Sequence, residues 1–180
     1  MAGDVITLIT ADHRRVEALL SRLGAERGER RATVAELHAL LTAHARAEED
    51  RVYPGIDAHH GLEEHKEAEI LLDALRRAEA GSAEFEETLE LLAGTVVRHI
   101  RDEETTMLPL LARTAGDKRL KRLGAAFAER RQQVLRALAA AGDGQVTRAD
   151  LYERARRADL PGRSRMTKPE LEAALDQAAQ

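Results

Sequence analysis

The sequence predicts an all-α protein: an up-down four-helix bundle followed by a fifth helix and a small C-terminal helix-extended-helix module. Three observations support this fold class. The composition is rich in Ala and Leu and includes only two Tyr, two Phe and no Trp among 180 residues, which favours helices over strands. Apolar residues recur at helical spacing through four long segments. A sparse pattern of His, Glu and Pro occurs twice, first from His44 and again from His99.

The four apolar-periodic segments are separated by short polar or glycine-containing stretches. Each is long enough, at about 1.5 Å per residue, to cross a small bundle. The segments span about 4–24, 32–57, 62–80 and 83–114. A fifth segment, rich in Arg, spans about 117–141 and ends before the sequence Gly-Asp-Gly.

The composition changes after the fifth segment, which predicts a domain boundary near 142–146. We expect a four-helix bundle over 1–116, a basic connecting helix over 117–142 and a small helical module over 146–180. The net charge of −4 is unevenly distributed. The bundle contains 14 Lys+Arg and 23 Asp+Glu, a balance of −9, whereas the rest contains 14 and 9, a balance of +5. This asymmetry suggests two roles within one chain.

The composition also excludes several classes of site. The chain contains no Cys, so disulfides and thiolate ligands are excluded and any metal must be bound by His and carboxylates. No apolar run approaches ~18 residues, and the N-terminal stretch MAGDVITLIT lacks a basic start and a cleavage site. We therefore expect a soluble, cytoplasmic protein without a membrane segment.

The doubled pattern belongs to a longer internal repeat. It reads HARAEEDRVYP from His44 and HIRDEETTMLP from His99, with His, two Glu and Pro at the same offsets. The upstream stretches DHRRVEALL and EHKEAEILL also match each other, so His13 corresponds to His65. The chain thus contains one helix pair written twice, and we expect the two pairs to pack about a pseudo-two-fold axis.

The repeated polar residues lie on the apolar stripes of their predicted helices. On the first helix, for example, His13 continues the stripe formed by Ile9, Val16 and Leu20. Each of the four helices places one His toward the core, and two of them add a Glu one turn later, because residues i and i+4 share a face. The six candidate metal ligands are His13, His44, Glu48, His65, His99 and Glu103.

Burying four imidazoles and two carboxylates is unfavourable unless something pairs them. An unpaired buried polar group costs roughly 1–3 kcal/mol, and an unpaired charge considerably more. Two divalent cations held inside four helices would provide that pairing. A single HxxxE pattern is usually a solvated pair, but six residues that follow one symmetry favour a dinuclear metal site. No separate nucleophile or acid–base pair is apparent, so any catalysis would be performed by the metals.

With these motifs, residues 4–115 resemble the hemerythrin-like family of HHE cation-binding four-helix bundles. The family pattern is a His on the first helix, HxxxE on the second, a His on the third and HxxxE on the fourth, and this chain contains all of it. The resemblance implies two iron ions, with or without an oxo bridge. The implied ligands are His13 and His44 for one iron, His65 and His99 for the other, and Glu48 and Glu103 as bridges.

One position departs from the oxygen-carrying hemerythrins, which have a second His one turn after the third-helix His. Here that position is Glu69. A carboxylate adds negative charge and stabilises the ferric state, which disfavours reversible oxygen carriage relative to redox reaction with peroxide, nitric oxide or oxygen. Whether Glu69, its repeat equivalent Glu17, or Tyr53 contacts the metals is left open, as is zinc or manganese in place of iron.

The tail from Thr147 to Leu175 resembles the SAP-like and Rho N-terminal helix-extended-helix modules, which often bind nucleic acid. Seven basic and three acidic residues lie between Arg148 and Lys168, enough for a few phosphate contacts. The second helix of the tail is acidic and no aromatic residue offers a stacking platform, so a small interaction module that binds no nucleic acid is the alternative.

The leading hypothesis is a non-haem di-iron protein that binds or reacts with oxygen, peroxide or nitric oxide, in sensing, detoxification or a stress response. If the protein is an enzyme, peroxide decomposition is the expected activity. The competing hypothesis is a DNA-binding or interaction protein that docks through its basic C-terminal module, with the bundle as a structural or ligand-responsive unit. The sequence does not indicate an oligomeric state.

Overall fold

The computed structural model describes residues 3–25, 30–56 and 59–142, and in the C-terminal segment residues 155, 160–162, 166–167, 170–171 and 173–175. All regular structure in these ranges is helical and none of it is strand, so the predicted all-α class is confirmed. The chain divides into two compact units, Met1–Arg136 and Ala137–Gln180. Within the described ranges, no helix is both long and apolar enough to span a bilayer.

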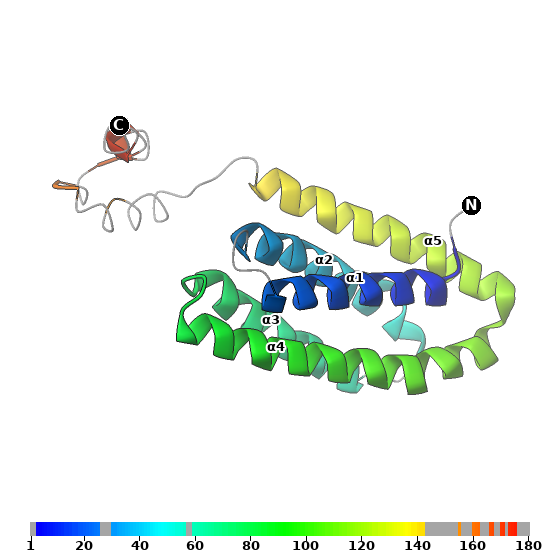
Figure 1. Ribbon diagram of the computed structural model, residues 1–180. Coiled ribbons are helices and arrows are strands. Elements are labelled where there is room, and N and C mark those ends of the chain that lie inside the picture. The colour runs from blue at the N-terminus through cyan, green and yellow to red at the C-terminus, as the bar shows by residue number, and fades with distance from the viewer. Residues whose placement is uncertain are drawn as a thin grey trace. The chain divides into compact units, whose positions relative to one another are not determined.

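Four antiparallel helices form the bundle of the first unit, as predicted (Figure 1). These helices are α1 (Val5–Ala25), α2 (Arg30–Arg51), α3 (His59–Arg77) and α4 (Ala83–Asp102). A short 3-10 turn, η1 (Tyr53–Gly55), follows α2, and a π-helical turn, η2 (Glu103–Met107), joins α4 to α5 (Leu108–Gly142). The part of α5 that belongs to the first unit lies along the bundle (Figure 1).

Local side-chain bonds explain where two of the helices begin. Ser82 accepts a hydrogen bond from the amide of Phe85 at 3.1 Å and caps α4. Glu84 in the first turn of α4 lies near the positive end of the helix dipole. Asp4 caps α1 in the same manner, accepting from the amide of Thr7 at 2.9 Å. These caps fix the starts of two helices that contribute histidines to the core.

The end of α4 differs from the sequence-based prediction, which placed one continuous helix over 83–114. The structure interrupts this segment with the π-helical turn, where the amide of Leu108 donates to the carbonyl of Glu103. π-turns widen the helical hydrogen-bond pattern and occur often at functional sites. The predicted break before Asp117 is also present, as a kink in α5 at Gly116, whose φ of 66° suits a residue without a Cβ.

The core of the first unit consists of two apolar clusters separated by a polar layer. Along α1, Val5 and Ile9 belong to one cluster, Val16 and Leu20 belong to the other, and His13 lies between them. Helix α2 crosses the same boundary in the opposite direction, from Val34 and Leu37 to Ala47, and the chain from α4 into α5 crosses it between Ile100 and Leu108. The apolar clusters provide the burial that stabilises the bundle, and they place the polar layer out of contact with bulk water.

Short pieces of the C-terminal unit are described. Ala155 and Leu171 are fully buried and belong to one small apolar cluster. The amide and hydroxyl of Thr167 donate to Glu170 at 2.6 and 2.7 Å, which is part of the capping arrangement predicted from Thr-x-x-acid. The other predicted helix start, at 147–150, lies outside the described residues. The proposed three-part domain division and the likeness of this tail to SAP-like modules stay predictions.

Candidate metal centre

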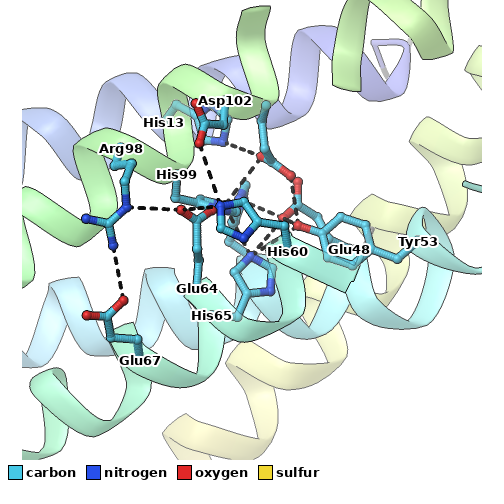
Figure 2. A network of polar contacts seen from close by, with 12 residues as sticks. His13, Glu48, Tyr53, His60, Glu64, His65, Glu67, Arg98, His99 and Asp102 are labelled. Carbon is cyan, nitrogen blue, oxygen red and sulfur yellow. Dashed lines mark hydrogen bonds and ion pairs between the residues drawn. The ribbon is translucent and has the colours of Figure 1, made fainter. Parts of the chain in front are cut away.

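The polar layer contains all six residues that the sequence singled out, and the structure brings them together. They come from all four bundle helices and from the first residue of the π-turn, and each is at most 8% exposed. The residues are His13 on α1, His44 and Glu48 on α2, His65 on α3, His99 on α4 and Glu103 in η2. Figure 2 shows His13, Glu48, His65 and His99 of this group pointing toward one another.

The two carboxylates each face two histidine Nε2 atoms. Glu48 Oε2 lies 3.2 Å from His44 Nε2 and 3.3 Å from His65 Nε2. Glu103 Oε2 lies 3.2 Å from His13 Nε2 and 3.5 Å from His99 Nε2. The four imidazoles therefore direct the same nitrogen toward a common centre, which is the arrangement that a shared metal cluster requires.

Ring distances indicate how the histidines pair. The rings of His13 and His44 lie 5.1 Å apart, and those of His65 and His99 lie 4.6 Å apart. The other contacts among these four rings are longer, at 6.4 and 6.5 Å. The layer contains two overlapping groups of potential metal ligands, and within each group the donor atoms lie within 4.8 Å of one another. His99 belongs to both groups. These groups are His13, His44, His99 and Glu103, and Glu48, His65 and His99.

Several donor atoms in the layer are buried without a hydrogen-bond partner among the described residues. They include Nε2 of His13, Nε2 of His44, Oε1 of Glu48 and Oε2 of Glu103. His13 Nε2, His44 Nε2 and Glu103 Oε2 each face another group of the layer at 3.2–3.5 Å without a well-directed hydrogen bond, and Glu48 Oε1 has no such neighbour among the described residues. Buried polar atoms in this condition are rare in folded proteins. Imidazole nitrogens and carboxylate oxygens are the donors that first-row divalent cations accept. The residues present therefore fit a metal site.

Burial and the facing carboxylates act in opposite senses on the protonation of the layer. Burial disfavours charge on His44, but Glu48 and Asp12 outweigh it and raise the pKa of His44 to about 10. Burial likewise acts to lower the pKa of His65, but the opposite effect of Glu48 and Glu49 is larger, and the pKa rises to about 9. Burial alone would raise the pKa of Glu48, yet the two histidines hold it well below its usual range. Without metal, protons on two imidazoles balance the buried carboxylates.

A second set of four carboxylates faces the outer nitrogens of the same histidines. Nδ1 of each ring lies between 2.9 and 3.5 Å from a carboxylate oxygen. The pairs are His13 with Glu104, His44 with Asp12, His65 with Glu49 and His99 with Glu64. A proton on Nδ1 directed at a carboxylate leaves the Nε2 lone pair for a metal and fixes the ring orientation.

These carboxylates obey the internal repeat, although the sequence reasoning missed them. Asp12 and Glu64 each precede a candidate histidine directly, in the matched stretches DHRRVEALL and EHKEAEILL. Glu49 and Glu104 are the second Glu of each HxxxEE motif. The signal was therefore present as a matched acid at four repeat positions. It was missed because a charged residue next to a candidate ligand in the sequence ordinarily points into solvent.

Each of the four carboxylates is braced by an arginine. Glu104 pairs with Arg14, Glu49 with Arg46 at 2.8 Å, Glu64 with Arg98 at 3.3 Å and Asp12 with Arg131 at 2.6 Å. Three of these arginines belong to the bundle helices, whereas Arg131 belongs to α5. The result is four chains of histidine, carboxylate and arginine that lead outward from the centre.

Helix α5 closes the centre beside His44. Phe127 is 1% exposed and its ring meets that of His44 edge-on at 5.9 Å. Gly124 packs so closely on the N-terminal backbone that a Cβ would lie 2.5 Å from the carbonyl oxygen of Gly3. The sequence reasoning assigned α5 only a connecting role, and its contribution to the centre was missed because it depends on tertiary packing.

The sequence left open whether Tyr53, Glu69 or Glu17 contacts the metal centre, and the structure places only Tyr53 in the polar layer. Tyr53 joins the layer: its hydroxyl donates to Glu103 at 2.8 Å and its ring stacks on His65. Burial, together with the neighbouring glutamates, raises the pKa of Tyr53, so the phenol keeps its proton. Glu69 and Glu17 do not join the layer, because each lies at the surface and pairs with an arginine.

A cavity of about 50 Å³ adjoins the centre. All four candidate histidines contribute to its lining, and most of the remaining wall is apolar, including Val16, Leu41, Leu72, Val96 and Ile100. Arg46 and Glu69, which pair at 3.4 Å, line its side between α2 and α3. The volume is sufficient for one or a few water-sized molecules next to the imidazoles.

Comparison with known proteins agrees with this geometry. The family described as Hemerythrin HHE cation binding domain matches residues 4–111. The chain belongs to this family. The resemblance identified from the sequence is thereby confirmed for the bundle, and the chain is of a cation-binding type whose His and Glu clusters suit a metal site.

Two individual proteins are similar to the chain. The crystal structure of a hemerythrin HHE cation binding domain-containing protein from Mycobacterium kansasii superposes with a TM-score of 0.66 at 21% identity, covering 98% of this chain and 99% of that one. This similarity shows the fold. A protein named DNA nickase from Nostoc sp. (strain PCC 7120 / SAG 25.82 / UTEX 2576) is 24% identical over 151 residues, which is 79% of this chain and 42% of that protein. The chain thus spans less than half of the length of the Nostoc relative.

The metal-free protein is expected to lose stability as the pH rises above about 6.5. The raised pKa values of His44 and His65 contribute stability that is fully present below their unfolded value of 6.5 and is lost as the pH passes about 9 and 10. The free energy of unfolding in urea should fall by several kcal/mol, to order of magnitude, over this range. A flat or rising profile for the metal-free protein would contradict the protonation assigned to the layer.

Arg131→Gln is expected to weaken metal binding by about tenfold, because Arg131 braces Asp12 against His44 and loss of such outer partners typically costs 10–100-fold. Arg130→Gln is the matched control, since the adjacent Arg130 pairs with Asp50 at 2.6 Å on the surface and leads to no histidine. Affinity is measured by competition with a chelator. Equal effects of the two substitutions would show that α5 acts only through general stability.

Proposed function

We propose that the protein is a non-haem di-iron protein whose centre binds or reacts with oxygen, peroxide or nitric oxide. The observation that supports this most strongly is the convergence of six buried nitrogen and oxygen donors, several of them without a hydrogen-bond partner, at the middle of a hemerythrin-type bundle. A donor set without sulfur also accepts zinc or manganese. Membership of the hemerythrin family favours iron.

The proposed ligand assignment follows the ring pairs. His13 and His44 would hold one iron, His65 and His99 would hold the other, and both irons would share two carboxylates. Those shared carboxylates are Glu48 and Glu103. In support, the rings assigned to each iron are the closest pairs in the layer. These six residues would hold the two irons, and the bound irons would supply the redox chemistry.

The surrounding residues would control what reaches the irons. The cavity of about 50 Å³ beside the imidazoles has mostly apolar walls, which suits a small molecule such as oxygen, nitric oxide or peroxide and excludes larger organic substrates. Tyr53 would stay a neutral hydrogen-bond donor to Glu103 and would hold that carboxylate in place. Its proton is directed at the carboxylate.

Reaction is favoured over reversible carriage by the residue that replaces the additional histidine. The residue at that position, Glu69, lies at the surface and pairs with Arg46, so this position would contribute no ligand to the centre. The centre would hold four histidines and two carboxylates. An outer carboxylate at Nδ1 of each ring would raise the basicity of that histidine as a ligand, which favours the ferric state. Peroxide decomposition, detoxification of nitric oxide and sensing of either molecule are the roles that suit such a centre.

Protein produced with iron is expected to contain about two irons per chain and to show near-ultraviolet oxo-to-ferric absorption bands. His13→Ala and Glu103→Ala should lower the iron content and weaken the bands, because each removes a donor from the layer. His38→Ala is the control, since His38 lies near Arg76 outside the layer. Colourless protein without iron, or variants that retain the full iron content, would contradict the proposal.

A second candidate function is DNA binding through the basic C-terminal module and the adjoining part of α5, with the bundle as a structural or ligand-responsive unit. Two observations favour it. The similar protein from Nostoc is named a DNA nickase. In addition, the first turns of α5 after its kink expose four cations on the face opposite the buried Leu120 and Phe127. These cations are Lys118, Arg119, Lys121 and Arg122, and none forms an ion pair with another described residue.

Replacing these four cations by Gln is expected to weaken binding of the full-length protein to duplex DNA and to flatten its salt dependence, because each lost phosphate contact reduces the slope of log K against log salt by about 0.9. Lys66→Gln with Arg77→Gln, which removes exposed charge from α3, is the control. Fluorescence anisotropy at several salt concentrations measures both quantities. DNA binding that is absent, or equally affected by the control, would rule out this face of α5.

A further inference from the structure

A second cluster of metal-binding side chains lies outside the polar layer. It consists of His60 and Glu64, one turn apart on α3, and Asp102, the last residue of α4. His60 Nε2 lies 3.4 Å from Glu64 Oε1 and 3.9 Å from Asp102 Oδ2 (Figure 2). One donor atom from each residue lies within 4.8 Å of the others. We call this cluster the outer site.

The outer site is open to water on one side and built into the protein on the other. The side chains of His60 and Asp102 are 69% and 49% exposed, whereas that of Glu64 is only 5% exposed. A buried carboxylate that directs an oxygen toward an exposed imidazole and an exposed carboxylate provides a fixed ligand beside two adjustable ones. This mixture distinguishes the outer site from solvated ion pairs such as Arg15 and Glu36, in which both partners are exposed.

Glu64 also connects the outer site to the inner layer. Its Oε2 accepts from Nδ1 of His99 at 3.0 Å, while its Oε1 faces His60. The two oxygens of one buried carboxylate therefore serve two different histidines. Since Oε2 already orients His99, Oε1 is the atom that the outer site can use.

In the structure, the positive charge that faces Glu64 Oε1 comes from the guanidinium of Arg98. Its Nε lies 3.3 Å from Glu64 Oε1, and its Nη2 donates to Glu67 at 3.1 Å (Figure 2). The side chain of Arg98 is 50% exposed, so it can retain Glu67 while it releases Glu64. The guanidinium therefore balances the charge of Glu64 and competes with any ion that arrives from solvent.

We propose that the outer site binds a third cation, a first-row divalent ion such as zinc, manganese or ferrous iron, through His60 Nε2, Glu64 Oε1 and Asp102 Oδ2. Ligands about 2.1 Å from a common ion lie roughly 3.0–3.5 Å apart, so the observed separations need only small rotations of the two exposed side chains. One imidazole and two carboxylates suit these ions, and water would complete the coordination. The inference does not depend on which metal occupies the inner layer.

Zinc titration of untagged, metal-free, full-length protein tests the outer site. Calorimetry combined with metal analysis after dialysis should show three ions per chain, two bound tightly and a third more weakly. His60→Ala and Asp102→Asn should each weaken the third ion by at least about tenfold and keep the first two. Arg98→Gln should tighten the third ion on the order of threefold, because it removes a competing positive charge. It should also weaken the tight pair, because Arg98 braces Glu64 against His99. His38→Ala should change none of these values.

Three results would overturn the outer site: no third ion in the unsubstituted protein, a third ion that survives Asp102→Asn, or weaker binding of the third ion in Arg98→Gln. The second result would place the ion on other side chains. Failure of the inner centre is distinguishable, because His13→Ala addresses only the two tight ions. Loss of the third ion with retention of the tight pair in His60→Ala, together with the opposite response of Arg98→Gln, supports the outer site.

Discussion

The burial of charge at the middle of the bundle is the constraint on which the rest of the structure depends. Two carboxylates and four imidazoles lie in a layer from which bulk water is excluded, between two apolar clusters. Charges in such surroundings must be neutralised, either by protons on the histidines or by metal ions in their place. The carboxylates that face His44 and His65 raise the pKa of both histidines, which favours the first state in the metal-free protein. Several donor atoms of the layer lack a well-directed hydrogen bond with the described residues, which suits the second state.

The internal repeat resolves this constraint by applying one solution twice. An acid directly before a histidine orients the ring of a neighbouring helix, and the second Glu of each HxxxEE motif orients another. Every candidate histidine thus acquires a carboxylate partner and an arginine behind it. The symmetry is broken at two places. Tyr53, which has Leu108 as its repeat equivalent, donates to Glu103, and α5 braces Asp12 through Arg131. Both departures from the symmetry lie within or beside the centre. They make the surroundings of the His13 and His44 pair differ from those of the His65 and His99 pair.

The sequence was sufficient to predict the helices and the burial of the six candidate residues, because helical periodicity and the repeat both report on which residues face the core. Their role as ligands stays a prediction. The sequence was insufficient for the second set of carboxylates, since Asp12 and Glu104 resemble surface charges until the packing of neighbouring helices is known. The π-turn at Glu103 was also missed, because its residues have no distinctive helix-ending signal. The roles of Phe127 and Arg131 depend on where α5 docks, which no local pattern specifies. The tail could be predicted only by resemblance, and most of it lies outside the described residues.

The most direct test of the central claim is X-ray absorption at the iron edge of the iron-loaded protein, because it reports the ligand atoms and the neighbouring metal together. The account predicts a first shell of nitrogen and oxygen only, with imidazole scattering and an iron–iron contribution that disappears in Glu48→Ala. A shell without imidazole scattering, or a mononuclear spectrum from fully loaded protein, would contradict it.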